Sequence, residues 1–270
     1  SEKILKKEEM MKLRMRGWIG GWVIAFVLVM ATSASAFELG ARGWVWFPEL
    51  KNLDIQATTS GAEGTKIDTK DVLDIGNEAT YSVEAFGGAG RHHLSLMFTP
   101  FDYQESQILA SNLKFKGADF LKGTAVESEM AYSMFDIKYQ YDFVDMENIL
   151  AGFSVGGIVQ VKYSTGSFKL NATGTGFDRT ESFDSWIPML GLGVHVGLLA
   201  DLLELRAQAT AAASDSENYA YEALADLSLT PFPFLDIHAG YKLVQLKVDR
   251  NNYMMDVFYT GPYAGLTIGF

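Results

Sequence analysis

The stretch FDIKYQYDF, from Phe135 to Phe143, alternates apolar and polar side chains without a break. Successive side chains of an extended strand point to opposite faces, so this stretch predicts a strand with one apolar and one polar face. The apolar face holds Phe135, Ile137, Tyr139, Tyr141 and Phe143, and the polar face holds Asp136, Lys138, Gln140 and Asp142. The same period of two recurs in GFSVGGIVQVKYS (152–164), LELRAQATA (203–211) and LDIHAGYKL (235–243).

Counting such runs predicts about ten strands. They lie near residues 37–47, 78–87, 92–103, 130–143, 149–164, 184–199, 203–213, 218–230, 234–247 and 256–270. Eight and twelve strands are the alternatives, because the ends of such runs are defined only to within a few residues. A soluble β-sandwich also alternates, so the alternation alone does not choose between a sandwich and a barrel.

The connections between these runs alternate in length, which favours a barrel. Short connections occur at 88–91, 145–148, 200–204 and 231–234, and long polar ones at 48–76, 105–124 and 165–182. Tight turns at one end and larger loops at the other are typical of transmembrane barrels. Twelve aromatic residues near the predicted strand ends add two expected girdles at the membrane surfaces: Trp44, Trp46, Phe47, Tyr139, Tyr141, Phe143, Trp186, Tyr219, Tyr221, Tyr241, Phe258 and Phe270.

Composition narrows the function classes. The chain of 270 residues has no cysteine, which excludes disulfides and thiolate metal sites. Its formal net charge of -11 argues against a nucleic-acid partner, since phosphate binding requires clustered Lys and Arg.

The N-terminal residues have the order of a secretory signal peptide. Lys12, Arg14 and Arg16 precede an apolar stretch from Trp22 to Met30, and the small residues of 34–36 follow. The apolar stretch is shorter than the roughly 20 residues of a spanning helix. We therefore expect residues 1–36 to be a leader and signal peptide cleaved after Ala36, and residues 37–270 to form a single barrel domain.

The chain ends on GPYAGLTIGF, residues 261–270, an alternating strand that stops on an aromatic residue. With the signal peptide and the alternating strands, this end resembles that of small outer-membrane β-barrel proteins of Gram-negative bacteria. Tyr263, Gly265, Ile268 and Phe270 occupy the positions of the family's C-terminal assembly signal. The resemblance implies that the barrel assembly machinery reads this strand, which then closes against the first one. It covers the architecture of the whole mature chain and singles out no subfamily.

The expected fold is all-β: a closed antiparallel transmembrane β-barrel in the outer membrane, with short periplasmic turns and longer extracellular loops. If the apolar face meets lipid, the polar face lines the lumen. The lumen-lining polar residues are predicted to be Glu38, Arg42, Glu84, Asp136, Lys138, Asp142, Lys162, Glu204, Arg206, Glu222, Asp226, Asp236 and Lys242, together with His93, His195 and His238. Buried charges must pair or meet water, so a salt-bridged structural interior and a narrow path for ions or small solutes are both compatible with this set.

Two further function classes stay open. Some outer-membrane barrels are surface proteases or lipid A deacylases, and RHHLSL places His93 and Ser95 on one face of a strand, which resembles the deacylase pair. Those enzymes act at the external end, whereas all four histidines are expected toward the periplasm, so no enzyme activity, cofactor or metal is predicted. Polar loops such as 48–76 are where adhesion would reside. The expected partners are outer-membrane lipid and lipopolysaccharide, with a monomeric chain.

The terminal aromatic gives a direct test. Deletion of Phe270 is expected to lower the yield of folded protein in the outer membrane, because the assembly signal would lose its last residue. Membrane fractionation and heat-modifiable mobility on gels measure this yield. A yield and mobility equal to those of the intact chain contradict the prediction.

Overall fold

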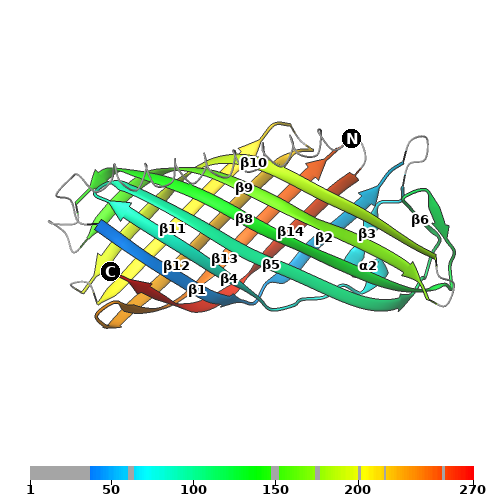
Figure 1. The fold of residues 1–270 in the computed structure, drawn as a ribbon, viewed down its shortest axis with the longest axis horizontal. Coiled ribbons are helices and arrows are strands. Elements are labelled where there is room, and N and C mark those ends of the chain that lie inside the picture. The colour runs from blue at the N-terminus through cyan, green and yellow to red at the C-terminus, as the bar shows by residue number, and fades with distance from the viewer. Residues whose placement is uncertain are drawn as a thin grey trace, which may run out of the picture.

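Backbone pairing links each strand of the ring to the next and returns from the last strand to the first. The computed structural model describes residues 37–59, 64–146, 152–173, 177–199, 202–215, 217–250 and 253–270; the expected signal peptide lies outside these ranges. Ten strands form the ring (Figure 1): β1 Phe37–Trp46, β4 Thr80–Ala89, β5 His92–Ile108, β8 Ala125–Asp145, β9 Phe153–Ala172, β10 Phe177–Leu198, β11 Leu203–Ala213, β12 Tyr219–Phe232, β13 Leu235–Asp249 and β14 Tyr253–Gly269.

The ring closes between the first and last strands. β14 pairs antiparallel with β13 on one side and with β1 on the other, in a register from Gly40 opposite Gly269 to Trp46 opposite Tyr263. The prediction of a closed antiparallel barrel with about ten strands is therefore confirmed. None of the helices among the described residues has the length and hydropathy needed to cross a membrane.

The end opposite the short turns, called the external end below, carries more structure than the sequence predicted. Beyond Pro48, β2 (Glu49–Ala57) continues along β14, and β3 (Ile67–Asp68) and α2 (Thr69–Leu73) follow. A hairpin of β6 (Leu113–Phe115) and β7 (Ala118–Phe120) lies at the same end, at the right of Figure 1. The interpretation of 48–76 and 105–124 as plain polar loops is therefore wrong.

The expected long loop at 165–182 is also wrong. β9 runs up to Ala172 and β10 begins at Phe177, so strand pairing covers most of this stretch. Its residues do alternate: Thr165, Ser167 and Lys169 point outward while Phe168 and Leu170 are buried inside. Ser, Thr, Gly and Asn dominate its composition, and this composition concealed the alternation.

The outward face of β10 defines the membrane-spanning band. Trp186, Leu190 and Leu192 are more than half exposed, and apolar residues continue to Leu198. At about 3.3 Å per residue and a tilt of about 45°, the stretch from Trp186 to Leu198 has a height of roughly 28 Å, close to the ~25 Å apolar band of outer-membrane barrels. Asp178, Thr180, Ser182 and Asp184 continue the same face with polar side chains. The wall therefore rises above the lipid on the external side.

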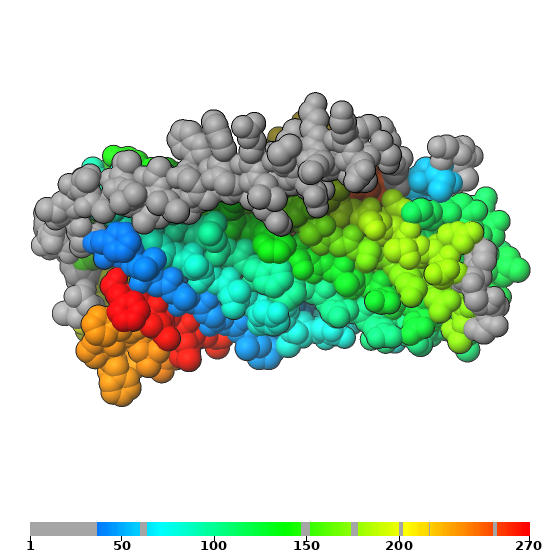
Figure 2. All heavy atoms as spheres, in the orientation of Figure 1, coloured from blue at the N-terminus to red at the C-terminus, as the bar shows by residue number. Residues whose placement is uncertain are grey.

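Two of the expected girdle residues face the other way. Trp44 and Trp46 lie inside the barrel, 5% and 0% exposed, because they share the inward phase of β1 with Glu38 and Arg42. Phe47, Trp186, Tyr221 and Tyr241 are exposed toward the external side, and Tyr141, Phe143 and Phe270 toward the turns. Figure 2 shows the side chains of neighbouring strands packed against one another across one face of this wall.

The interior of the external half is apolar. Trp46, Phe101, Tyr103, Tyr132 and Tyr259, here called the aromatic core, are all at most 4% exposed. Phe101 stacks on Tyr132 at 4.6 Å between ring centroids and on Tyr259 at 5.0 Å. Leucine, valine and phenylalanine side chains from β2, β9, β13 and β14 surround these rings. The sequence predicted no such apolar layer inside the barrel, and the predicted lumen residues lie between this core and the short turns.

Gly166 on β9 allows this packing. A Cβ there would lie 2.2 Å from Cβ of Tyr132 and 2.5 Å from the backbone oxygen of Ala131, whereas a Cβ on Gly157 would meet nothing within 4 Å. Gly166→Ala is therefore expected to lower the free energy of unfolding by about 1–3 kcal/mol, as overpacking does. The matched change Gly157→Ala is expected to leave it nearly unchanged. Urea unfolding in detergent micelles measures both; equal losses contradict the packing argument.

Candidate functional site

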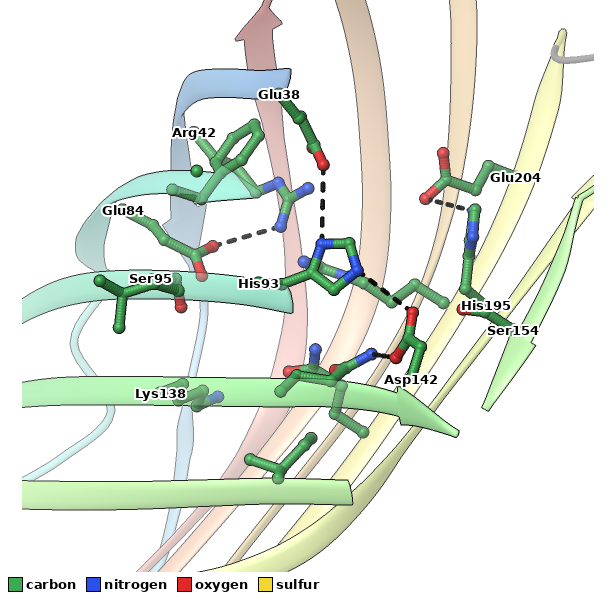
Figure 3. Close-up of a pocket in the computed structure, with 17 residues that line it drawn as sticks. Glu38, Arg42, Glu84, His93, Ser95, Lys138, Asp142, Ser154, His195 and Glu204 are labelled. Atoms are coloured by element: carbon green, nitrogen blue, oxygen red, sulfur yellow. Dashed lines mark hydrogen bonds and ion pairs between the residues drawn. The ribbon is translucent and has the colours of Figure 1, made fainter. Parts of the chain in front are cut away.

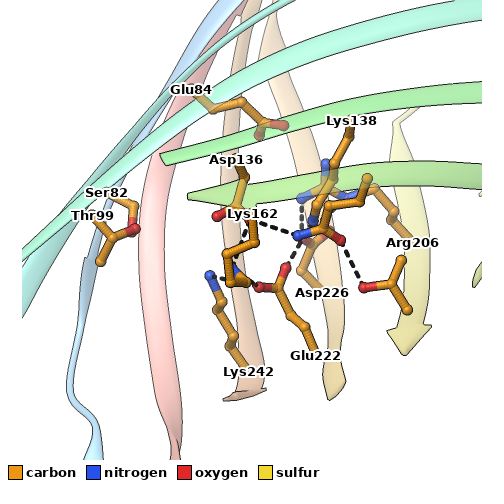
Figure 4. Close-up of polar contacts among 12 residues, drawn as sticks. Ser82, Glu84, Thr99, Asp136, Lys138, Lys162, Arg206, Glu222, Asp226 and Lys242 are labelled. Carbon is orange, nitrogen blue, oxygen red and sulfur yellow. Dashed lines mark hydrogen bonds and ion pairs between the residues drawn. The ribbon is translucent and has the colours of Figure 1, made fainter. Parts of the chain in front are cut away.

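Below the aromatic core, inward-pointing charges from four strands meet at the centre of the barrel. β8 contributes Asp136 and Lys138, β9 Lys162, β12 Glu222 and β13 Lys242, here called the lysine network (Figure 4). Lys162 Nζ lies 2.6 Å from Asp136 Oδ1 and 2.8 Å from Glu222 Oε2. Lys138 Nζ lies 2.8 Å from Glu222 Oε1. Each of these five side chains is at most 9% exposed.

Neutral side chains add hydrogen bonds to the network. Gln160 Nε2 donates to Asp136 Oδ1 at 2.6 Å, and Thr210 Oγ1 donates to Gln160 Oε1 at 2.7 Å. Lys242 Nζ is more loosely held, 3.9 Å from Glu222 and 5.3 Å from the centre of the Trp46 ring. Three lysines face two carboxylates, so the network depends strongly on each carboxylate.

Two arginine pairs lie beside the network. Arg206 Nη2 is 2.6 Å from Asp226 Oδ2, and the Tyr263 hydroxyl donates to the same oxygen at 2.6 Å. Arg42 Nη1 is 3.2 Å from Glu84 Oε2, and Arg42 Nε donates to Thr267 Oγ1 at 2.9 Å. These pairs link β1, β4, β11, β12 and β14 across the interior.

Toward the short turns, the interior opens into a cavity of about 340 Å³, the periplasmic pocket. His93 lies between two carboxylates: Nε2 is 3.2 Å from Asp142 Oδ2, and Nδ1 is 3.7 Å from Glu38 Oε2 (Figure 3). On the facing wall, His195 Nε2 is 2.9 Å from Glu204 Oε1. Gly156 leaves room for this arrangement, because a Cβ there would lie 2.1 Å from Asp142 Oδ1.

The structure distributes the predicted lumen residues over three groups. Five form the lysine network, four form the two arginine pairs, and Glu38, Asp142 and Glu204 line the pocket with His93 and His195. Asp236 lies apart at the β12–β13 turn, where it accepts a hydrogen bond from Thr230. Buried His238 packs edge-on against the rings of Trp44 and Tyr263. Gln160, Thr210 and Thr267 were missed, although each shares the inward phase of its strand.

The C-terminal residues divide between the two faces of β14. The Tyr263 side chain is buried inside against Asp226, and a Cβ on Gly265 would lie 2.5 Å from Cβ of Trp44. Ile268 and Phe270 point outward, 53% and 73% exposed, and the Phe270 ring stacks on Phe234 at 5.4 Å.

The deacylase-like pair has an unsuitable geometry. A histidine that activates a serine must direct one ring nitrogen at the hydroxyl, but both ring nitrogens of His93 face carboxylates. His93 and Ser95 also lie in the pocket at the short-turn end. Among the described residues, no group of three or more His, Asp or Glu side chains is placed to hold a metal ion.

Comparisons with known proteins bear on the fold. No protein-family model matches the chain, and no curated protein matches it in sequence. The solved structure of the outer membrane protease OmpT from Escherichia coli is similar, with a TM-score of 0.59, 10% identity and coverage of 89% of this chain and 100% of that chain. The translocator domain of the autotransporter NalP from Neisseria meningitidis gives a TM-score of 0.42 at 13% identity, covering 95% and 96%.

At 10% identity, the likeness to OmpT shows the fold alone. Taken with the closed ring and the apolar outward band, it defines the class: the protein is an outer-membrane β-barrel. The short-turn end therefore faces the periplasm, and the end with the aromatic core faces outward.

The geometry of the lysine network predicts that the loss of the Glu222 carboxylate strongly lowers the free energy of unfolding. Glu222→Gln leaves three buried lysines facing Asp136 alone, and breaking such a buried pair costs about 3–5 kcal/mol. Glu204→Gln removes a half-exposed partner of His195 and is expected to cost about 0–1 kcal/mol. Urea unfolding in detergent micelles compares the two variants. A loss for Glu222→Gln no larger than that for Glu204→Gln contradicts the central role of the network.

Proposed function

We propose that this protein is a structural outer-membrane barrel that is sealed against ions and solutes. The observation that carries the proposal is the filling of the interior in two successive layers. The aromatic core closes the external half, and the lysine network closes the middle. A path from the periplasmic pocket to the outside would have to pass both.

The aromatic core supports a sealed external half because its polar atoms bind one another. The hydroxyls of Tyr103 and Tyr132 both donate to the Tyr259 hydroxyl, at 3.2 and 2.8 Å, and Trp46 Nε1 donates to the backbone oxygen of Gly261 at 3.2 Å. An ion entering here would lose its water without gaining charged partners, which is costly in an apolar surrounding.

The lysine network supports a sealed middle for a different reason. Lys138 and Lys162 contact the carboxylates of the network at 2.6–2.8 Å. A permeating ion would have to separate pairs that are shielded from water, where the attraction between charges is strong. This favours the structural role over the narrow channel that the sequence left open.

We also propose that the barrel assembly machinery recognises the C-terminal end of the chain. The outward-facing Phe270 ring at the end of β14 supports recognition by the barrel assembly machinery. We propose a monomer, because β1 and β14 pair with each other and leave no sheet edge at the closing point.

Planar-bilayer recording tests the sealed state. The wild-type protein, inserted at high salt, is expected to give no discrete current steps. The double variant Phe101→Ala, Tyr259→Ala removes two stacked rings of the aromatic core and is expected to give small, salt-dependent openings. Gel mobility confirms that both proteins are folded, and liposome flotation confirms insertion. Regular openings of the wild-type protein contradict the proposal.

A further inference from the structure

The wall of the barrel has a seam on its external side. β9 pairs with β10 from Phe177 to Val196, but β11 pairs with β10 only from Leu190 to Leu198. Among the described strands, none pairs with residues 177–189 of β10 on the side opposite β9. This part of β10 therefore has one free edge.

Side chains and a proline protect this edge from a further strand. The backbone oxygens of Thr180 and Asp184 accept hydrogen bonds from Lys116 Nζ at 2.6 Å and from the Tyr253 hydroxyl at 2.8 Å. Both residues are even-numbered, so the peptide groups of even residues point to the free edge. Pro188 shares this phase, and its missing N–H removes a donor where strand addition would need one. The seam is therefore unsuited to a β-strand partner.

A cleft of about 570 Å³ lies at the lower end of the seam, here called the wall cleft. Trp186, Pro188 and Leu190 form one side, and residues 211–213, all alanines, form the floor. Tyr219, Lys247, Val248 and Arg250 line the other side. Trp186 and Leu190 belong to the outward apolar band, so the cleft opens into the outer leaflet of the membrane at its external boundary.

The wall cleft has an apolar part on the membrane side and a basic part on the headgroup side. Methyl groups of the alanines and the side chain of Leu190 provide an apolar surface with room for an aliphatic chain. Lys247 and Arg250 lie at the polar end. Lys247 Nζ is 2.7 Å from Glu217 Oε2, but that carboxylate is 55% exposed, and such exposed pairs contribute little. Lys247 can therefore turn to an anion at headgroup level, where Arg250 also lines the cleft.

We propose that the wall cleft binds one phosphorylated, acylated lipid of the outer leaflet, lipopolysaccharide. An acyl chain lies along the alanine floor, and a phosphate of the lipid A moiety contacts Lys247 and Arg250. The site goes beyond the sealed structural role, since it gives the barrel a specific lipid partner on one side of its wall. It requires no conformational change, because the cleft is already present.

Native mass spectrometry in detergent tests this site, with bisphosphorylated hexa-acyl lipid A as the probe and phosphatidylethanolamine as the comparison lipid. The double variant Lys247→Gln, Arg250→Gln is expected to bind lipid A about tenfold more weakly, which corresponds to ~1.4 kcal/mol. The control Lys122→Gln, Lys169→Gln makes the same change of charge at the external side, away from the cleft, and is expected to bind as the wild type does.

A second variant tests the apolar half. Ala211 lies opposite Leu190 and faces outward, so Ala211→Phe fills the cleft from the lipid side without entering the barrel interior. It is expected to reduce lipid A binding while gel mobility shows an unchanged fold. The proposal is overturned if the double variant Lys247→Gln, Arg250→Gln and its control bind lipid A equally, if phosphatidylethanolamine binds as well as lipid A, or if a second protein chain occupies the site.

Discussion

The structure depends on the requirement that every backbone N–H and C=O in the acyl region finds a partner within the sheet. β1 and β14 meet this requirement by pairing with each other from Gly40 opposite Gly269 onward. Closure then brings distant strands together across the lumen. Glu222 lies 84 positions from Lys138 and 60 from Lys162, yet its two carboxylate oxygens bind both. The lysine network is therefore a consequence of closure and could not form in an open sheet.

The sequence predicted what a period of two can determine. Alternation gave the strand number, the inward phase of Asp136, Lys138 and Lys162, and the end at which the histidines lie. It could not give the partners across the lumen, because phase specifies a face, whereas a contact also needs the height and angular position of each strand. Composition misled at 165–172, where Ser, Thr and Gly suggested a loop, and at Trp44, where an aromatic side chain suggested a lipid-facing girdle.

The interior combines two kinds of packing that are usually found in different proteins. The external half resembles the core of a soluble domain, with stacked rings and aliphatic side chains around Tyr259. The middle contains paired charges with neutral hydrogen-bonding neighbours such as Gln160. On β8 the inside changes with the outside: the inward side chains are mostly apolar where the outward ones are polar, and they are charged where the outward ones are apolar.

Along β8, the apolar side chains move from the inward face to the outward face, and this change affects the depth of the protein in its bilayer. On β8, Glu127 and Glu129 point outward above Phe135 and Ile137, while buried Met130 and Tyr132 give way to Asp136 and Lys138 inside. A vertical displacement of the barrel would draw carboxylates toward the acyl chains at one boundary and expose aliphatic side chains to water at the other. The pattern therefore favours one depth of the barrel in the bilayer, and it does so independently of any anchor outside the barrel.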